Sequence, residues 1–442
     1  MSERKMIHLC LAHMSETGEE QKYVKEAFDT NWVVPLGPNV NAFEQSLEKF
    51  LSPEGEDWNE KQGMRRVVAL SAGTAAIHLA LLACGVGPGD EVCVQSFTFC
   101  ASSHPIVYVG ATPVFIDSEP GTWNMDPDLL ERAILDRKAK TGSYPKAIVP
   151  VALYGMPYDC ERIMAIADRY GIPVIEDAAE GLGSRFKGRM LGTFGQFGVL
   201  SFNGNKMITT SGGGALVCNP NAGAGNAASQ HTAQAHAERV MWLATQARDA
   251  YPYYHHSAIG YNYRMSNVCA GIGRGQMTVL EAHIAHHQHV QALYRELLRD
   301  VEGVTLHESP SADYDSNYWL CAMTLDPSLR ISGQENAYKE VSQTAVGGAA
   351  SVIQMVDSPT TDCQPHANVE ALRVYMFQKQ VECRPLWKPM HKQPVYAGAP
   401  AYLNGVSEEI FKVGLCLPAG PMVSDDDVRY IVSCLKEAIE EA

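Results

Sequence analysis

One lysine of this chain, Lys206, lies between two apolar runs and among small polar residues. It follows "FGVLSF" (197–202) and precedes "MITTSGGGALVC" (207–218), in which three glycines lead into the second run. The ordinary alternative is a solvated surface lysine. A lysine held where two strands meet a loop can instead lose its hydration, which favours the neutral amine and makes it a nucleophile toward carbonyl groups. Lys206 is therefore a candidate for a Schiff-base lysine.

A candidate phosphate site follows the predicted strand "VVAL". Ser71, Ala72, Gly73 and Thr74 open a predicted helix there, so their backbone amides and the Thr74 hydroxyl lie at the positive end of the helix dipole. Ser201, five residues before the lysine, offers a second hydroxyl to the same anion. The alternative is an ordinary Ser/Thr cap of a helix.

A carboxylate, Asp177, ends the apolar run "IPVIE" and is followed closely by Glu180. Burying an unpaired carboxylate costs several kcal/mol, and the first cation downstream is Arg185. The partner of Asp177 is therefore distant in sequence or belongs to a ligand. A helix N-cap is the alternative, with similar weight.

These groups together meet the needs of one cofactor. Pyridoxal 5'-phosphate requires an amine for its aldehyde, a carboxylate for its pyridinium nitrogen and a phosphate site. Phe97 and Phe99, at another strand end, provide rings that can lie against a pyridine, unless both are core aromatics. Competing motifs fail, because "GVGPGD" lacks the last glycine of a dinucleotide loop, "GNKM" is no Walker A loop and H-E-x-x-H is absent. We predict no metal site.

Apolar runs and helical stretches alternate through the first two thirds of the chain. This alternation predicts an α/β fold with a mostly parallel sheet, whose ligands sit at the carboxyl ends of the strands. The predicted strands are 66–70, 91–97, 112–117, 146–153 and 172–177. After the helical stretch 262–298 the pattern changes, which predicts a large domain (1–285) and a smaller C-terminal one (286–442). Segments 221–236 and 342–368 carry little information and are expected to be loops or insertions.

Composition excludes several classes of protein. The chain has 442 residues, of which 46% are hydrophobic and 19% are charged, and its formal net charge is -15. That acidity argues against nucleic-acid binding. We find no secretory signal and no apolar run of the ~18 residues that a membrane span needs. Twelve cysteines without a C-x-x-C pair predict reduced thiols and a cytoplasmic protein.

With these residues located, the chain resembles the DegT/DnrJ/EryC1/StrS family of sugar-nucleotide aminotransferases, which are fold type I pyridoxal phosphate enzymes. Seven blocks occur in the family's order along nearly the whole chain. They are "GPNVNAFEQSLEKFL", "SAGTAAIHLALLACGVGPGDEV", "ATPVFIDSEPGTWNMDP", "VIEDAAEGLGSRFKGRMLGTFGQFGVLSFNGNKMITTSGGG", "GYNYRMSNVCAGIGRGQM", "RPLWKPMH" and "GLCLPAG". The resemblance implies the aspartate aminotransferase-like fold, with a large sheet domain and a smaller C-terminal α+β domain.

The resemblance also implies a role for each residue. Lys206 would bind the cofactor and move the proton between substrate carbons, and Asp177 would hold the pyridinium nitrogen. Phe99 would stack on the ring, and Glu180 would lie beside it where many relatives carry His or Gln. Asn262 would reach the phosphate from the neighbouring subunit of a homodimer. The phosphate would also be bound by Gly73, Thr74 and Ser201.

The most similar branch of this family is that of the UDP-bacillosamine pathway, on the segments 201–214, 245–248, 384–391 and 401–411. It implies a UDP-linked 2-acetamido-4-keto-6-deoxyhexose as acceptor and L-glutamate as donor. Trp387, Lys388 and His391 would then contact the sugar nucleotide, unless they form a polar surface loop. A GDP- or dTDP-linked sugar, a dehydratase or lyase, and a sugar-nucleotide sensor are the alternatives, although dehydratases of the family carry His in place of Lys206.

Overall fold

The computed structural model describes residues 4–52, 65–220, 233–338 and 363–442. The helices are α1 (Glu19–Asp29), α2 (Pro38–Phe50), α3 (Gly73–Ala83), α4 (His104–Tyr108), α5 (Pro127–Thr141), α6 (Cys160–Tyr170), α7 (Ala233–Ala244), α8 (Asn267–Met277), α9 (Leu280–Leu298), α10 (Ala367–Gln378), α11 (Val406–Val413) and α12 (Asp425–Glu440). The strands are β1 (Arg66–Leu70), β2 (Glu91–Gln95), β3 (Thr112–Ile116), β4 (Ala147–Val149), β5 (Ile175–Asp177), β6 (Arg185–Phe186), β7 (Arg189–Met190), β8 (Phe197–Ser201), β9 (Gly214–Cys218), β10 (Val304–Leu306), β11 (Tyr314–Asp315), β12 (Cys321–Leu325), β13 (Arg384–Pro385), β14 (Ala401–Tyr402) and β15 (Gly414–Leu417).

The main sheet runs in the order β1-β9-β8-β5 and continues as β4-β2-β3-β14. Parallel bridges from Ile148 to Val174 and from Val151 to Asp177 join the two halves. Strand β9 is antiparallel to both of its neighbours, whereas β5 and β8, and the strands from β4 to β14, pair in parallel. This confirms the mostly parallel sheet that the sequence predicts.

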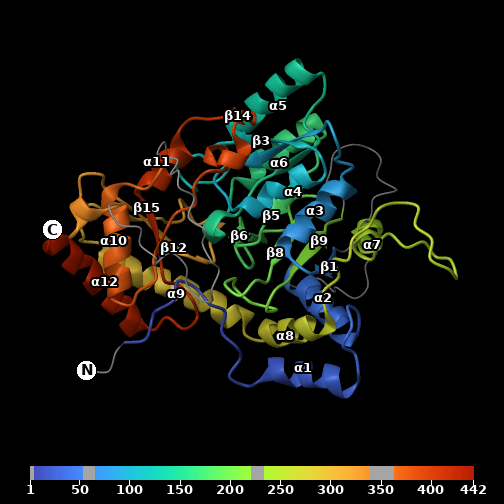
Figure 1. Ribbon diagram of the computed structural model, residues 1–442, viewed down its shortest axis with the longest axis horizontal. Helices are drawn as coiled ribbons and strands as arrows, with labels where there is room; N and C mark the ends of the chain where they lie inside the picture. The colour runs from blue at the N-terminus through green and yellow to red at the C-terminus, as the bar shows by residue number, and fades with distance from the viewer. Residues whose placement is uncertain (1–3, 53–64, 221–232, 339–362) are drawn as a thin grey trace.

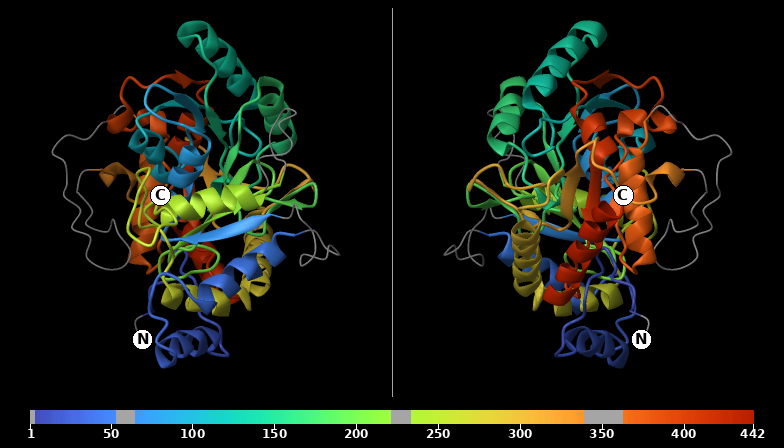
Figure 2. Two further views of the ribbon diagram at one scale, coloured as in Figure 1. Left: turned by 90° about the vertical axis from the view of Figure 1, so that its right-hand side faces the viewer. Right: turned by 90° about the vertical axis from the view of Figure 1, so that its left-hand side faces the viewer.

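Helix α3 starts immediately beyond β1 and is buried on nearly all sides. Its residues from Ala75 to Leu81 are all buried, which is typical of a helix enclosed within a core. It packs between β8 and β9 on one side and α4 and α7 on the other. In the left view of Figure 2, α7 lies alongside β1, which it contacts. The N-terminus of α3 is thereby fixed at the carboxyl end of the sheet.

A second, antiparallel sheet lies in the C-terminal part of the chain, in the order β10-β12-β15-β13. Helices α10 and α12 lie together on this side of the molecule, with α3 and β9 on the other side (Figure 1). Strand β14 nevertheless returns to the main sheet and pairs with β3. The expected boundary at residue 285 falls inside α9, and the division into 1–285 and 286–442 stays a prediction.

The observed elements differ from the predicted ones mainly at their ends. Strand β4 ends before Pro150 and β5 begins after Pro173, because proline lacks the amide hydrogen that a central strand needs. The helical stretch 262–298 is divided into α8 and α9, where the Thr278 hydroxyl donates to the Gly275 carbonyl. Of the two predicted loops, 221–232 and 342–362 lie outside the described residues; α7 begins at 233 and α10 at 367.

All twelve cysteines are free thiols, and most are buried. Burial raises the pKa of thiols such as Cys10, to about 12. Among the helices that the structure describes, none is both long enough and apolar enough to cross a membrane.

Candidate active site

A cavity of about 310 Å³ opens at the carboxyl ends of β1, β5 and β8, beside the N-terminus of α3. This is the edge at which an open parallel sheet binds ligands. The predicted residues that line it are Gly73, Thr74, Phe99, Asp177, Glu180, Ser201, Lys206 and Trp387. Tertiary structure therefore brings together residues from five separate segments of the chain.

The lysine is enclosed and is not a surface residue. Its side chain is 12% exposed, and its Nζ lies 3.2 Å from Oε1 of Glu180. The same Nζ lies 4.1 Å from the ring centroid of Trp319, over the face of the indole. Lys206 is thus held between a carboxylate and an aromatic face, within a cavity large enough for a small ring.

The Asp177 carboxylate is buried at the end of β5. It accepts hydrogen bonds from the Ser102 hydroxyl, at 2.6 Å, and from the Ala179 amide, at 3.2 Å. Burial raises the pKa of Asp177, and these two hydrogen bonds, together with the charge on Lys206, partly oppose that rise. The residues after Asp177 form bends and a turn, so the N-cap interpretation is wrong. One partner, Ser102, is distant in sequence, as predicted.

Glu180 is the second buried carboxylate of the cavity. Burial raises its pKa, while the nearby Lys206 charge and the hydrogen bond from the Tyr154 amide lower it. The Tyr154 amide donates to Oε2 at 2.8 Å, and Oε1 faces the lysine. Glu180 therefore lies beside the Lys206 amine, and its other carboxylate oxygen accepts a backbone hydrogen bond.

The start of α3 faces the cavity with Gly73 and Thr74 on its lining. Its N-cap residue, Ala72, makes no side-chain cap bond, so the helix-cap interpretation of this stretch is wrong. A Cβ on Gly214 would lie 2.4 Å from the Gly73 nitrogen, so only glycine lets β9 approach this turn. The Thr74 and Ser201 side chains line the same cavity. Amides and two hydroxyls at a helix N-terminus fit a phosphate group.

Two aromatic residues form the mouth of the cavity. Phe99 is 51% exposed, unlike the fully buried Phe97, so only Phe97 fits the core interpretation. The Phe99 and Trp387 rings meet edge to face, with centroids 4.6 Å apart. The Trp387 amide donates to the Tyr154 hydroxyl at 2.9 Å, which fixes the chain at this point.

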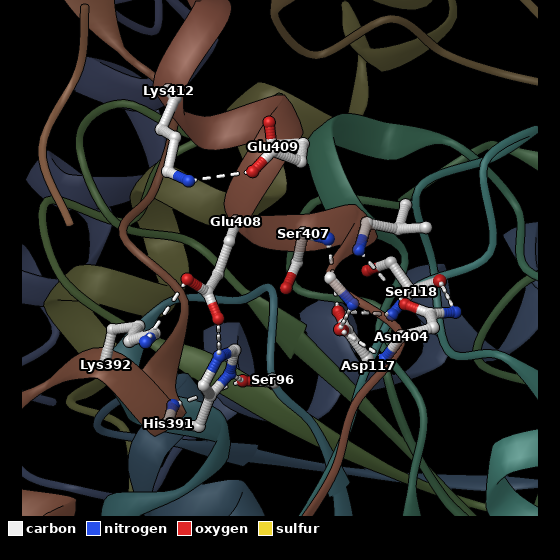
Figure 3. Close-up of polar contacts among 12 residues, drawn as sticks. Ser96, Asp117, Ser118, His391, Lys392, Asn404, Ser407, Glu408, Glu409 and Lys412 are labelled. Carbon is white, nitrogen blue, oxygen red and sulfur yellow. Dashed lines mark hydrogen bonds and ion pairs between the residues drawn. The ribbon is translucent and has the colours of Figure 1, made fainter. Parts of the chain in front are cut away.

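Three predicted site residues lie outside this cavity. Asn262 is exposed, and its backbone forms an antiparallel β-bridge with Thr245. Lys388 also does not line the cavity. The side chain of His391 is only 5% exposed, and in Figure 3 it lies between Ser96 and Glu408. Its Nδ1 lies 2.6 Å from the Ser96 hydroxyl and its Nε2 lies 3.1 Å from Glu408. Roles of Asn262, Lys388 and His391 in binding stay predictions.

A second cavity, of about 480 Å³, adjoins the first and shares Phe99, Asn205 and Trp387 with it. Arg384 and His8 lie on its lining, and both pair with Glu382. Sequence reasoning did not find this cavity. Its other residues come from the N-terminal segment, from the loop before β12, from around β13 and from β15, which lie far apart in the sequence.

The residues of the first cavity fit pyridoxal 5'-phosphate. They provide an enclosed amine, a buried carboxylate and a helix N-terminus without a side-chain cap, next to two hydroxyls. Within the described residues, no group of three or more His, Cys, Asp or Glu side chains could hold a metal ion.

Known proteins resemble the whole chain. The model of the DegT/DnrJ/EryC1/StrS aminotransferase family matches residues 14–350 and 334–436. A protein of Bacillus subtilis (strain 168) named as a pyridoxal phosphate-dependent aminotransferase, EpsN, is 40% identical over 98% of this chain and 95% of its own length. The GDP-perosamine synthase of Escherichia coli O157:H7 is 32% identical over 96% of each chain.

Solved structures share the fold. A DegT/DnrJ/EryC1/StrS aminotransferase from Brucella abortus superposes with a TM-score of 0.76, at 25% identity and over 96% of each chain. A protein of Streptococcus pneumoniae solved in a PLP form gives a TM-score of 0.78 over 99% of each chain, at 21% identity. These likenesses confirm the predicted fold class. The chain belongs to the DegT/DnrJ/EryC1/StrS aminotransferase family and is a pyridoxal phosphate-dependent sugar aminotransferase.

Proposed function

We propose that this enzyme transfers the amino group of L-glutamate to the 4-keto carbon of a UDP-linked 2-acetamido-4-keto-6-deoxyhexose. The product would be a UDP-4-amino sugar for bacterial glycan synthesis, as in the UDP-bacillosamine pathway. The observation that carries the proposal is the cavity in which Lys206, Asp177 and the N-terminus of α3 converge, next to a second cavity with room for a sugar. The segments 201–214 and 384–391 support the choice of sugar by their resemblance to that branch.

When bound, pyridoxal 5'-phosphate supplies an aldehyde that carries the amino group and a ring that withdraws electrons. The Lys206 amine accepts the proton from the α-carbon of the donor and later returns a proton to C4 of the sugar. Asp177 would accept a hydrogen bond from the protonated pyridine nitrogen, and that positive charge would in turn stabilise the buried carboxylate. Thr74, Ser201 and the first amides of α3 hold the phosphate.

The active enzyme is proposed to be a homodimer with shared sites. Apolar side chains lie exposed at Trp32–Leu36 and at Tyr251–Ile259. Exposed apolar patches of this kind mark interaction surfaces, because contact of apolar surface with water is unfavourable. Asn262 lies three residues after the second stretch, and its exposed side chain could reach the cavity of a partner subunit. A second copy of this chain is therefore the proposed occupant of both surfaces. The free thiols are typical of a reducing compartment, which supports a cytoplasmic location.

A GDP-linked 4-keto sugar is the second candidate acceptor, because the GDP-perosamine synthase of Escherichia coli is 32% identical along almost the whole chain. A 3-keto sugar has weaker support, since the UDP-2-acetamido-2-deoxy-3-oxo-D-glucuronate aminotransferase of Pseudomonas aeruginosa matches only 60% of this chain. Lys206 disfavours a dehydratase, because dehydratases of the family carry His there, and the intact lysine, aspartate and phosphate site disfavour a sensor. Amine formation on a keto-sugar nucleotide would separate an aminotransferase from a lyase.

The test is turnover of a panel of keto-sugar nucleotides by the purified holoenzyme. UDP-, GDP- and dTDP-linked 3-keto and 4-keto sugars are incubated with L-glutamate, and the products are identified by mass spectrometry. We expect amine formation on the UDP-linked 4-keto acetamido sugar and none with Lys206→Ala. Preferential turnover of the GDP-linked sugar would replace the proposed acceptor, and no turnover of any 4-keto sugar would reject it. Borohydride reduction and peptide mapping then locate the cofactor, which we expect on Lys206.

A further inference from the structure

A corner of the chain before β12, Asn317–Trp319, lies against the reactive lysine. Trp319 is 2% exposed, and its indole face lies 4.1 Å from the Lys206 Nζ. A cation over an indole face is attracted by the ring quadrupole. The indole Nε1–H also donates to the carbonyl of Asn205 at 2.6 Å. Trp319 thus contacts the lysine at its charged end and holds the backbone of the preceding residue.

Asn317, two residues earlier, holds the other member of the ion pair. Its side-chain amide donates to the carbonyls of Glu180 and Leu182, each at 2.9 Å. Its Oδ1 accepts the Trp319 amide at 2.9 Å. A Cβ on Gly155 would lie 1.9 Å from this oxygen, so a glycine is required for the close approach. The Asn317 amide group therefore ties the backbone of Glu180 to the backbone of Trp319.

The corner itself is locked in an unusual conformation. Tyr318 has a φ of 47°, which a non-glycine residue keeps only when its surroundings fix it. The Asn317 amide donates to the Ser184 hydroxyl at 2.9 Å, and the buried His287 ring lies 3.2 Å from the Tyr318 carbonyl oxygen. The corner is therefore a rigid support for the two side chains that flank Tyr318.

We propose that the Asn317–Trp319 corner sets the position of the Lys206 amine relative to Glu180, with Trp319 as a positioning residue. One end of the corner fixes each member of the ion pair, so the corner determines their 3.2 Å separation. The amine is then held at one place whenever it is not bonded to the cofactor. The proposal depends on Lys206 as the cofactor-binding residue, but not on which sugar is the substrate.

The test measures how fast the cofactor-free protein captures pyridoxal 5'-phosphate, from the growth of visible absorbance. Trp319→Leu removes the aromatic face that fixes the amine, and we expect capture to slow about fivefold, because the amine then spends less time in the orientation that meets the aldehyde. Trp319→Phe keeps a ring but loses the indole N–H, and should slow capture less. The visible circular dichroism of the loaded protein, which reports a fixed cofactor orientation, should weaken in the same order.

Trp123→Phe is the matched control. Trp123 is also a buried tryptophan, stacked on His307 with centroids 3.6 Å apart, and it lines neither cavity. It should lower thermal stability without slowing capture. The proposal would be overturned if a folded Trp319→Leu protein captured the cofactor at the wild-type rate and gave the wild-type dichroism. If Trp319→Leu does not fold, the same two results in Trp319→Phe would overturn it. Failure of the sugar panel leaves these measurements unaffected, so the two proposals fail separately.

Discussion

The Nζ of Lys206 and Oε1 of Glu180 lie 3.2 Å apart inside the protein, so this amine has a buried counter-ion beside it. Burial raises the pKa of Glu180, and the adjacent lysine charge opposes that rise. Any change in the charge on Lys206 therefore changes how strongly Glu180 holds a proton. The chemistry of the lysine and the protonation of this glutamate are coupled.

Glu180→Gln should slow catalysis while leaving the cofactor in place. The amide can still accept the Tyr154 amide hydrogen, but it offers the lysine no charge. Loss of one charge-assisted hydrogen bond predicts about a tenfold fall in the rate of the half-reaction with L-glutamate. Stopped-flow absorbance of the loaded enzyme measures that rate. Glu180→Asp, which keeps the charge, is the control and should retain more activity; equal rates for wild type and Glu180→Gln would contradict the assignment.

Asp177→Asn should abolish most activity and yet stabilise the cofactor-free protein at neutral pH. The folded pKa is raised by burial from 3.8, so the buried carboxylate favours folding below that pH and opposes it once pH rises through the folded value. Removing the charge should therefore add about 1 kcal/mol to the free energy of unfolding at pH 8. Turnover should fall about 100-fold or more, because the pyridine nitrogen loses its partner.

Urea unfolding of the cofactor-free protein at pH 8 and at pH 4 checks this expectation. The gain in stability from Asp177→Asn should shrink at the lower pH, where the wild-type carboxyl is itself more protonated. Ser102→Ala removes the hydrogen bond at 2.6 Å without removing the carboxylate, and should have no such gain. A destabilised Asp177→Asn protein at pH 8 would show that the hydrogen bonds outweigh the cost of burial.

His307→Phe should reduce the acid sensitivity of folding. Burial lowers the pKa of His307 from 6.5 to about 3, so between these values the unfolded chain binds a proton that the folded protein does not. Stability is therefore lost as pH falls from 6.5, by about 2 kcal/mol from this residue at pH 5. Phenylalanine preserves the stacking on Trp123 and also removes the buried Nε2, which lacks a hydrogen-bond partner.

The measurement is the difference in unfolding free energy between pH 7 and pH 5. It should be smaller in His307→Phe than in the wild type by about 2 kcal/mol. His287 is also buried with a pKa lowered to about 3, but it is a poor choice for this test because its ring contacts the Tyr318 carbonyl oxygen. An unchanged difference would mean that His307 titrates normally in the folded protein.

His391→Ala should act mainly on stability and on the mouth of the cavity. The Ser96 hydroxyl accepts the His391 amide and lies against Nδ1, while Glu408 faces Nε2 (Figure 3). Truncation to alanine removes the hydrogen bonds of the imidazole ring to Ser96 and Glu408, which predicts a loss of about 2 kcal/mol in the free energy of unfolding. Because the same segment carries Trp387, the KM for the sugar nucleotide should also rise.

Lys388→Ala provides the comparison for that variant. If Lys388 contacts the sugar nucleotide, KM should rise with little change in the free energy of unfolding. His391→Gln, which can still hydrogen-bond at one position, should recover part of the lost stability. An effect of His391→Ala on KM alone, with full stability, would instead place His391 in direct contact with the substrate.

The chemistry of the cavity was predictable because its residues stand in local patterns. Lys206, Asp177 and Thr74 each follow an apolar strand, and the carboxyl ends of strands in one parallel sheet meet at one edge. The same apolar patterns predicted strands that continue through Pro150 and Pro173. The observed strands stop short of both residues, because proline has no amide hydrogen to donate to a neighbouring strand.

The sequence by itself determined the mostly parallel sheet, the cofactor and most of the predicted residues that line one cavity, because strand ends and glycine turns are read from neighbouring residues. Only the tertiary structure decided that Trp319 faces Lys206, that Asn317 holds Glu180 and that His391 turns toward Ser96. These contacts join segments more than a hundred residues apart, or link the two sheets. They depend on how the elements pack in three dimensions, which no local spacing of residues records.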